Sequence, residues 1–170
     1  MQVDPADTTG QRAPAPQVSH GLNLTLELND PRQMPQLLAQ LQLRSADTRA
    51  ALDGLNFVHF ARFLPTRGNA ALLVITEFDG PLQAYVMDFV IAIGDVFTLI
   101  LSYVKGAEGV GSVKENPRAF WEFIKANNAV VVLPGAMQWD DYPLYSAYEQ
   151  RTVLDIVGPR TTLPPLECTS

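Results

Sequence analysis

Near the start of the chain, apolar and polar positions alternate strictly. The even positions from 22 to 28 are all leucine, and the odd positions between them are polar. This alternation predicts a strand with one buried face and one polar face. The polar face carries Asn23, Thr25 and Glu27. Because we expect this strand at the centre of a sheet, we infer that these three side chains contact water, a ligand or a wet interface.

Two further segments follow with different periodicities. After the turn at residues 29–31, apolar residues recur every three or four positions from Met34 to Leu55, which predicts a helix with a possible break near Ser45. Residues 56–65 and 70–80 are rich in aromatic and β-branched side chains, and Thr66-Arg67-Gly68-Asn69 separates them. This pattern predicts a β-hairpin.

From residue 82 to residue 104 the chain is apolar almost all round, which predicts a long core helix. We expect Asp79 to cap its start, because Gly80 and Pro81 follow. The segment is long enough to cross a bilayer, but two central aspartates argue against a membrane span. These aspartates, Asp88 and Asp95, share a helix face with Tyr85, and we expect that face to be wet. Arg118 and Arg151 are their expected partners.

The last part of the chain predicts one more helix and two strands. Asn116-Pro117 begins an amphipathic helix whose aromatic residues are expected to cover the long helix. Residues 129–133 and 151–157 read as strands. The order strand, helix, strand, strand, helix, inserted helix, strand predicts an α+β, ferredoxin-like split βαβ fold, in which helices cover one face of a four-stranded antiparallel sheet.

Composition limits the domain organisation and the class of partner. We expect a flexible N-terminal arm at residues 1–19, a single domain at 20–158 and a loosely ordered tail at 159–170. The net charge of −6, with 12 scattered Lys and Arg residues, argues against nucleic acid or an anionic membrane surface as partner. The acidic N-terminus is unlike a secretory signal, and the lone Cys168 fits a reducing compartment, so we expect a cytoplasmic protein.

Candidate site residues cluster on the predicted hairpin. His59 is a candidate base or ligand, although a lone strand histidine is also a common structural residue. Arg62 lies three residues further on, and strand alternation places it on the opposite face. Glu77 and Asp79 share a face and form a candidate carboxylate pair. With two histidines and one cysteine in the chain, no metal-binding, phosphate-binding or nucleophile motif is present.

One resemblance rests on VHFARF at residues 58–63, TEFDG at 76–80 and the long helix after them. In this order they resemble the dimeric α+β-barrel superfamily, which includes dye-decolorising peroxidases, chlorite dismutase-like proteins and cofactor-free monooxygenases. The resemblance implies that two sheets pack face to face around a cavity. TEFDG is similar to the GxxDG motif of the peroxidases, with Asp79 at the distal aspartate. In those peroxidases the proximal haem histidine follows the motif, whereas both histidines of this chain, His20 and His59, precede it. Haem ligation is therefore disfavoured, and the cofactor is unknown.

Two functions follow as hypotheses. In the first, a homodimer encloses a hydrophobic small molecule, and the resemblance implies an oxidoreductase. His59 or Arg62 then polarises the ligand, Glu77 or Asp79 moves a proton, and Asn23, Thr25, Glu27 and Tyr85 line the cavity. Trp139, Tyr142, Tyr145 and Tyr148 are a candidate lid. The second hypothesis is a non-catalytic accessory protein that binds a partner through its apolar helix face.

Overall fold

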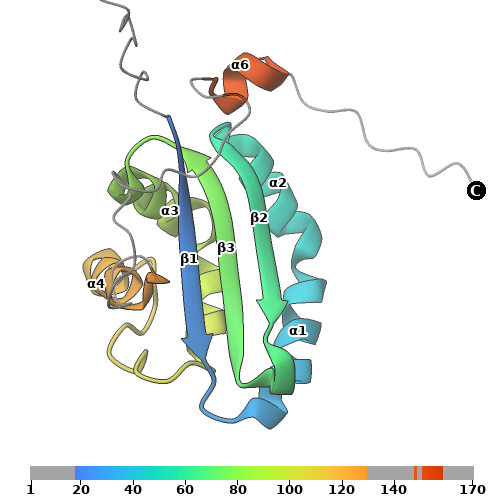
Figure 1. Ribbon diagram of the computed structural model, residues 1–170. Helices are drawn as coiled ribbons and strands as arrows, with labels where there is room; N and C mark the ends of the chain where they lie inside the picture. The colour runs from blue at the N-terminus through green and yellow to red at the C-terminus, as the bar shows by residue number, and fades with distance from the viewer. Residues whose placement is uncertain (1–17, 130–147, 149–150, 159–170) are drawn as a thin grey trace, which may run out of the picture.

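The computed structural model describes residues 18–129, 148 and 151–158. Within them, three strands form an antiparallel sheet in the order β1-β3-β2. The strands are β1 (Ser19–Glu27), β2 (Val58–Pro65) and β3 (Ala71–Asp79). The longer helices are α1 (Met34–Leu43), α2 (Ser45–Leu55), α3 (Leu82–Leu101) and α4 (Pro117–Asn127). Figure 1 shows α1, α2 and α3 behind the sheet and α4 beside β1.

The first strand confirms the alternation in the sequence. Leu22, Leu24 and Leu26 are 3%, 1% and 0% exposed and face the helices. Their partners on β3 are Thr76, Val74 and Leu72, which are also buried. The strand begins at Ser19, earlier than predicted, so this residue belongs to the sheet and not to the N-terminal arm.

The predicted hairpin is also confirmed. Strands β2 and β3 pair in antiparallel register, and the short 3₁₀ helix η2 (Arg67–Asn69) connects them. Gly68 and Asn69 have positive φ angles of 82° and 60°, which these two residue types adopt more readily than others. A register shift between Val58 and Phe60 interrupts the pairing of β2, so His59 lies in a β-bulge.

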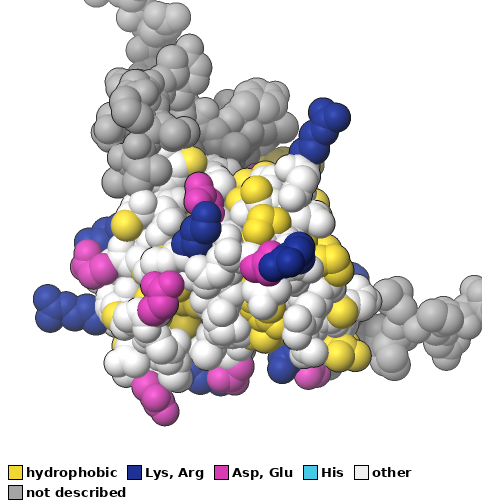
Figure 2. Space-filling view, turned by 90° about the horizontal axis from the view of Figure 1, so that it is seen from below, with side chains coloured by type: hydrophobic (Ala, Val, Ile, Leu, Met, Phe, Trp, Pro, Cys, Tyr) yellow, Lys and Arg dark blue, Asp and Glu magenta, His cyan; other side chains and the backbone are white. Residues whose placement is uncertain are grey.

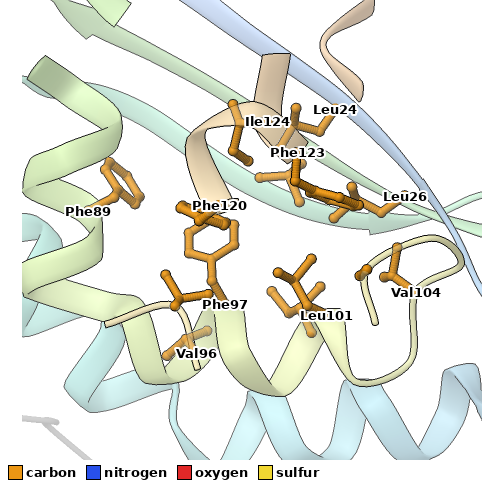
Figure 3. Close-up of a cluster of buried hydrophobic side chains, with 14 of the residues drawn as sticks. Leu24, Leu26, Phe89, Val96, Phe97, Leu101, Val104, Phe120, Phe123 and Ile124 are labelled. Atoms are coloured by element: carbon orange, nitrogen blue, oxygen red, sulfur yellow. The ribbon is translucent and has the colours of Figure 1, made fainter. Parts of the chain in front are cut away.

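Helix α3 forms the centre of the hydrophobic core. Ten of its residues are buried, and its backbone is distorted at Ile93, where φ is −133°. Figure 3 shows side chains from β1, α3 and α4 pointing toward one another. The ring of Phe120 on α4 lies 5.2 Å from that of Phe97 on α3, so α4 covers the long helix as predicted. The predicted helix over residues 34–55 is broken at Arg44, next to the expected position.

The predicted strand at 151–157 is wrong, because these residues contain the short helix α6 (Val153–Val157). Thr152 and Asp155 form a reciprocal capping box, in which each side chain accepts a hydrogen bond from the other residue's backbone N–H. This local motif starts a helix despite the alternating apolar pattern. The predicted strand at residues 130–133, the N-terminal arm up to residue 17, the tail at 159–170 and the first three lid aromatics lie outside the described residues. The described residues therefore establish an α+β fold whose antiparallel sheet has three strands in this part of the chain.

Helix α3 is also the one described helix that is long and apolar enough to cross a membrane by length and composition alone. However, 56% of the apolar window is buried inside the protein, as in the core helix of a soluble domain. Figure 2 shows the molecule from below, with acidic and basic side chains interspersed on that end.

Candidate functional site

The sheet face opposite α1, α2 and α3 carries most of the predicted site residues. Antiparallel partners share a face, so the register places Asn23, Ile75 and Arg62 in one row across the strands. Phe60 and Glu77 form the row nearer the end of β3. Large apolar side chains remain accessible here, since Phe60 is 67% exposed. The face therefore mixes apolar and polar groups.

A compact polar cluster lies at one end of this face. The Asp79 carboxylate accepts a hydrogen bond from His59 Nε2, at 2.7 Å from Oδ1. Ser19 Oγ lies 3.1 Å from the same nitrogen and donates to Asp79 Oδ1 at 3.3 Å. The backbone N–H of Val153 donates to Asp79 Oδ2 at 2.7 Å. The side chains of His59 and Asp79 are only 13% and 10% exposed, so the cluster is largely shielded from water.

The β-bulge corrects the predicted placement of His59 and Arg62. Regular alternation puts these two residues on opposite faces, but the bulge shifts the register by one residue. Arg62 pairs with Ile75, and His59 bonds to Asp79, which is on the same face of β3. Both side chains therefore lie on the face opposite the helices.

Asp79 does not have the capping role that the sequence predicts for it. Helix α3 begins after Pro81 without a side-chain cap, and Asp79 points instead to His59 and to the N-terminus of α6. Sequence reasoning missed Ser19 and the Val153 N–H as members of this cluster. A signal for α6 was present, because Thr152 and Asp155 have the spacing of a capping box.

The hydrogen-bond pattern determines which chemistry the cluster can perform. In a Ser-His-Asp triad, the serine and the carboxylate bind opposite nitrogens of the imidazole. Here both contact Nε2, so His59 does not link Asp79 to Ser19 in that way. When the Nε2–H group donates this hydrogen bond to Asp79, the proton of the neutral ring is on Nε2, and Nδ1 is the basic nitrogen. Nδ1 forms no hydrogen bond with the described residues. The geometry is that of an Asp-His pair suited to proton exchange.

Tyr85 lies on the other side of the sheet from this cluster. It is 2% exposed and stacks on Phe78 with ring centroids 3.7 Å apart. Burial raises the pKa of Tyr85. The hydroxyl oxygens of Tyr85 and Thr76 are both buried without a hydrogen bond, beside a void of about 10 Å³. The structure therefore separates Tyr85 from the other predicted site residues.

The predicted wet face of α3 is only partly wet. Tyr85 is buried, whereas Asp95 is exposed and forms an ion pair with Lys114, not with the predicted Arg118 or Arg151. Strand β1 lies at the edge of the described sheet and not at its centre as predicted, and on it Asn23 is half-buried and Thr25 is exposed. Glu27, at the far end of β1, forms an exposed ion pair of 3.4 Å with Lys105. Glu27 is therefore distant in register from His59 and Asp79.

No group of three or more potential metal ligands occurs in the part of the chain that the structure describes. In comparisons with known proteins, no family model, curated protein or solved structure matches the chain. The class that the fold and the site define is an α+β protein with an Asp-His pair at the end of a sheet face that helices α1 to α4 leave uncovered.

Proposed function

We propose that this protein is a homodimer that binds a hydrophobic small molecule between the uncovered sheet faces of two subunits, and that His59 exchanges a proton with this ligand. The observation that carries the proposal is the Asp79-His59 pair, which lies at the end of a partly apolar sheet face that no described helix of the α1 to α4 layer covers. We also infer that the β1-β3-β2 sheet is part of a ferredoxin-like fold, since that fold places helices on one face only.

The exposed apolar side chains supply the reason for dimerisation. Phe60 is 67% exposed and Leu64 is 41% exposed, and both share this face with Leu73 and Ile75. Covering such a strip removes apolar surface from water, and a second copy of the same face is self-complementary in a two-fold dimer. The row that contains Asn23 and Arg62 then lines a cavity with hydrogen-bonding groups.

The position of His59 supports a role in proton transfer. Asp79 fixes the ring through Nε2, and the Val153 N–H holds the second carboxylate oxygen. A carboxylate that holds the imidazole ring in one orientation keeps Nδ1 in a fixed position, as a histidine that acts as a general base requires. The oxidoreductase class implied by the resemblance remains a prediction, because no contact in the structure tests it.

The accessory role has less support from the helix layer. The accessory role requires a broad apolar surface on the helices and a sheet face whose own side chains leave no cavity. Among the large apolar residues of α3, only Ile91 is strongly exposed, at 77%. The sheet face, in contrast, keeps Phe60 accessible. We therefore rank small-molecule binding above partner binding through α3.

Native mass spectrometry of the full chain, purified from the organism that encodes it, tests this proposal. We expect a dimer that carries extra mass, and a Phe60→Glu variant that is monomeric and carries none. Leu43→Glu is the matched control, because Leu43 is 78% exposed on α1, away from the sheet face. A ligand-free monomer, or a Phe60→Glu variant that remains a loaded dimer, would contradict the proposal.

A second pair of variants separates proton exchange from structure. His59→Gln keeps an N–H donor for Asp79 but removes the basic ring nitrogen, whereas His59→Ala removes both. Once the bound molecule is identified by its mass, we expect the parent protein to exchange a proton of this ligand with deuterium from D₂O, and we expect His59→Gln to retain the dimer but to lose this exchange. Unchanged deuterium exchange in His59→Gln would show that His59 is only structural.

A further inference from the structure

An open groove of about 570 Å³ lies on the helix side of the sheet, remote from the Asp79-His59 pair. Its walls come from α1, α2, β2 and α3. The lining is mostly apolar, with Leu38, Leu41, Leu52, Ala61, Phe63 and Val96. The size falls within the range of small-molecule sites, which is roughly 300–1,000 Å³.

The groove exists because α2 packs incompletely against the rest of the protein. None of the residues of α2 is buried, in contrast to ten on α3. The break at Arg44 separates α1 from α2, and Leu52 on α2 and Phe63 on β2 remain half-buried. In the view of Figure 2, hydrophobic side chains gather on the right, the side on which Figure 1 places α1 and α2.

The polar residues of the groove have a consistent character. They are Gln42, Ser45, Thr48 and Arg49, and none of the described residues that line the groove is acidic. Arg49 is exposed and forms no ion pair with the described residues. In a protein with a net charge of −6, this groove therefore presents one unpaired guanidinium beside an apolar surface.

We propose that this groove binds a small amphiphilic monocarboxylate, a molecule with one carboxylate and an apolar body. The Arg49 guanidinium matches a carboxylate in charge and in the spacing of its donors. The Ser45 and Thr48 hydroxyls, on the same helix, add hydrogen-bond donors. The apolar body of the ligand lies along Leu38, Leu52 and Phe63, where it removes half-buried side chains from water.

This site is independent of the proposed function, because Ala61 and Phe63 face the helices whereas His59 and Phe60 lie at the opposite face. Backbone ¹H–¹⁵N chemical shifts of the full chain can distinguish the two surfaces. We expect decanoate, below its micellar concentration, to shift the amides of Leu38, Thr48 and Ala61. Shifts confined to the strand residues around Phe60, or no binding at all, would overturn the groove proposal.

Matched ligands and variants test the role of the charge. We expect decanoate to bind at least about tenfold more weakly to Arg49→Gln, and 1-decanol to bind equally to the variant and the parent. Arg67→Gln is the control, since Arg67 is an exposed arginine outside the groove with the same charge. Thr48→Trp, which fills the rim with a bulky side chain, should abolish the binding of both ligands. Equal decanoate affinity in Arg49→Gln and the parent would refute the assignment of the carboxylate to Arg49.

Discussion

Replacing Asp79 by alanine tests whether the polar cluster holds the end of the sheet together. The carboxylate accepts hydrogen bonds from His59, Ser19 and the backbone of Val153. These three donors come from β2, β1 and α6, so a single side chain joins three elements to β3. Asp79→Ala leaves all three donors without this acceptor.

The expected loss follows from the number of bonds and their burial. An intramolecular hydrogen bond contributes about 1 kcal/mol net, and a bond to a charged group contributes about 1.5–3 kcal/mol. The side chains of Asp79 and His59 are 10% and 13% exposed, so water replaces these bonds only in part. We therefore expect Asp79→Ala to lower the free energy of unfolding by about 2–4 kcal/mol. This is a large share of the roughly 5–15 kcal/mol typical of a domain.

Equilibrium unfolding in urea, followed by circular dichroism, measures this change. The matched control is Glu77→Ala, on the same strand and the same face but with no hydrogen bond to the described residues. We expect it to change the free energy of unfolding by less than about 0.5 kcal/mol. Asp79→Asn, which keeps an acceptor oxygen but loses the charge, should fall between the two. If Asp79→Ala were as stable as Glu77→Ala, the cluster would not stabilise the fold.

Four further predictions concern the core and the surface. Tyr85→Phe removes a buried hydroxyl that makes no hydrogen bond, so it should leave stability in urea unchanged or raise it by up to about 1 kcal/mol. Because burial raises the pKa of Tyr85, the folded protein keeps this proton above about pH 10, where the unfolded chain releases it. The free energy of unfolding should therefore fall as the pH rises above about 10, and it should fall less steeply in Tyr85→Phe. Phe120→Ala, at a side chain that is 1% exposed, should cost about 3–5 kcal/mol in the same urea assay. Lys114→Ala breaks an exposed ion pair with Asp95 and should cost less than about 1 kcal/mol.

Long periodic patterns made much of the fold predictable. The alternating leucines, the aromatic segments of the hairpin and the apolar run from residue 82 all formed the predicted element type, because each buries one consistent face. Local chemistry overrode the pattern at residues 151–157. There the alternation suggested a strand, but the capping box of Thr152 and Asp155 satisfies backbone groups at the start of a helix.

The residues of the candidate site were predicted from the sequence, but their arrangement in space was not. His59, Arg62, Glu77 and Asp79 all lie on one face, yet strand alternation separated His59 from Arg62. The error came from the β-bulge between Val58 and Phe60, which has no clear sequence signal. The contact with Val153 joins residues 74 positions apart and depends on tertiary packing. The groove beside α2 also depends on how two helices pack, which periodicity does not determine.

The bulge at His59 connects the stability of this fold to the chemistry we propose for it. Without the extra residue of the bulge, the His59 side chain would point to the helix face, and Asp79 would lose its partner on β2. The same region is held by backbone bonds from Asp79 to Phe57 and from Gly80 to Val18, at 2.8 and 3.0 Å. A base fixed in this way needs little reorganisation when it takes a proton, which favours proton exchange. The residues that would act on the ligand are therefore also the residues that join the strand ends.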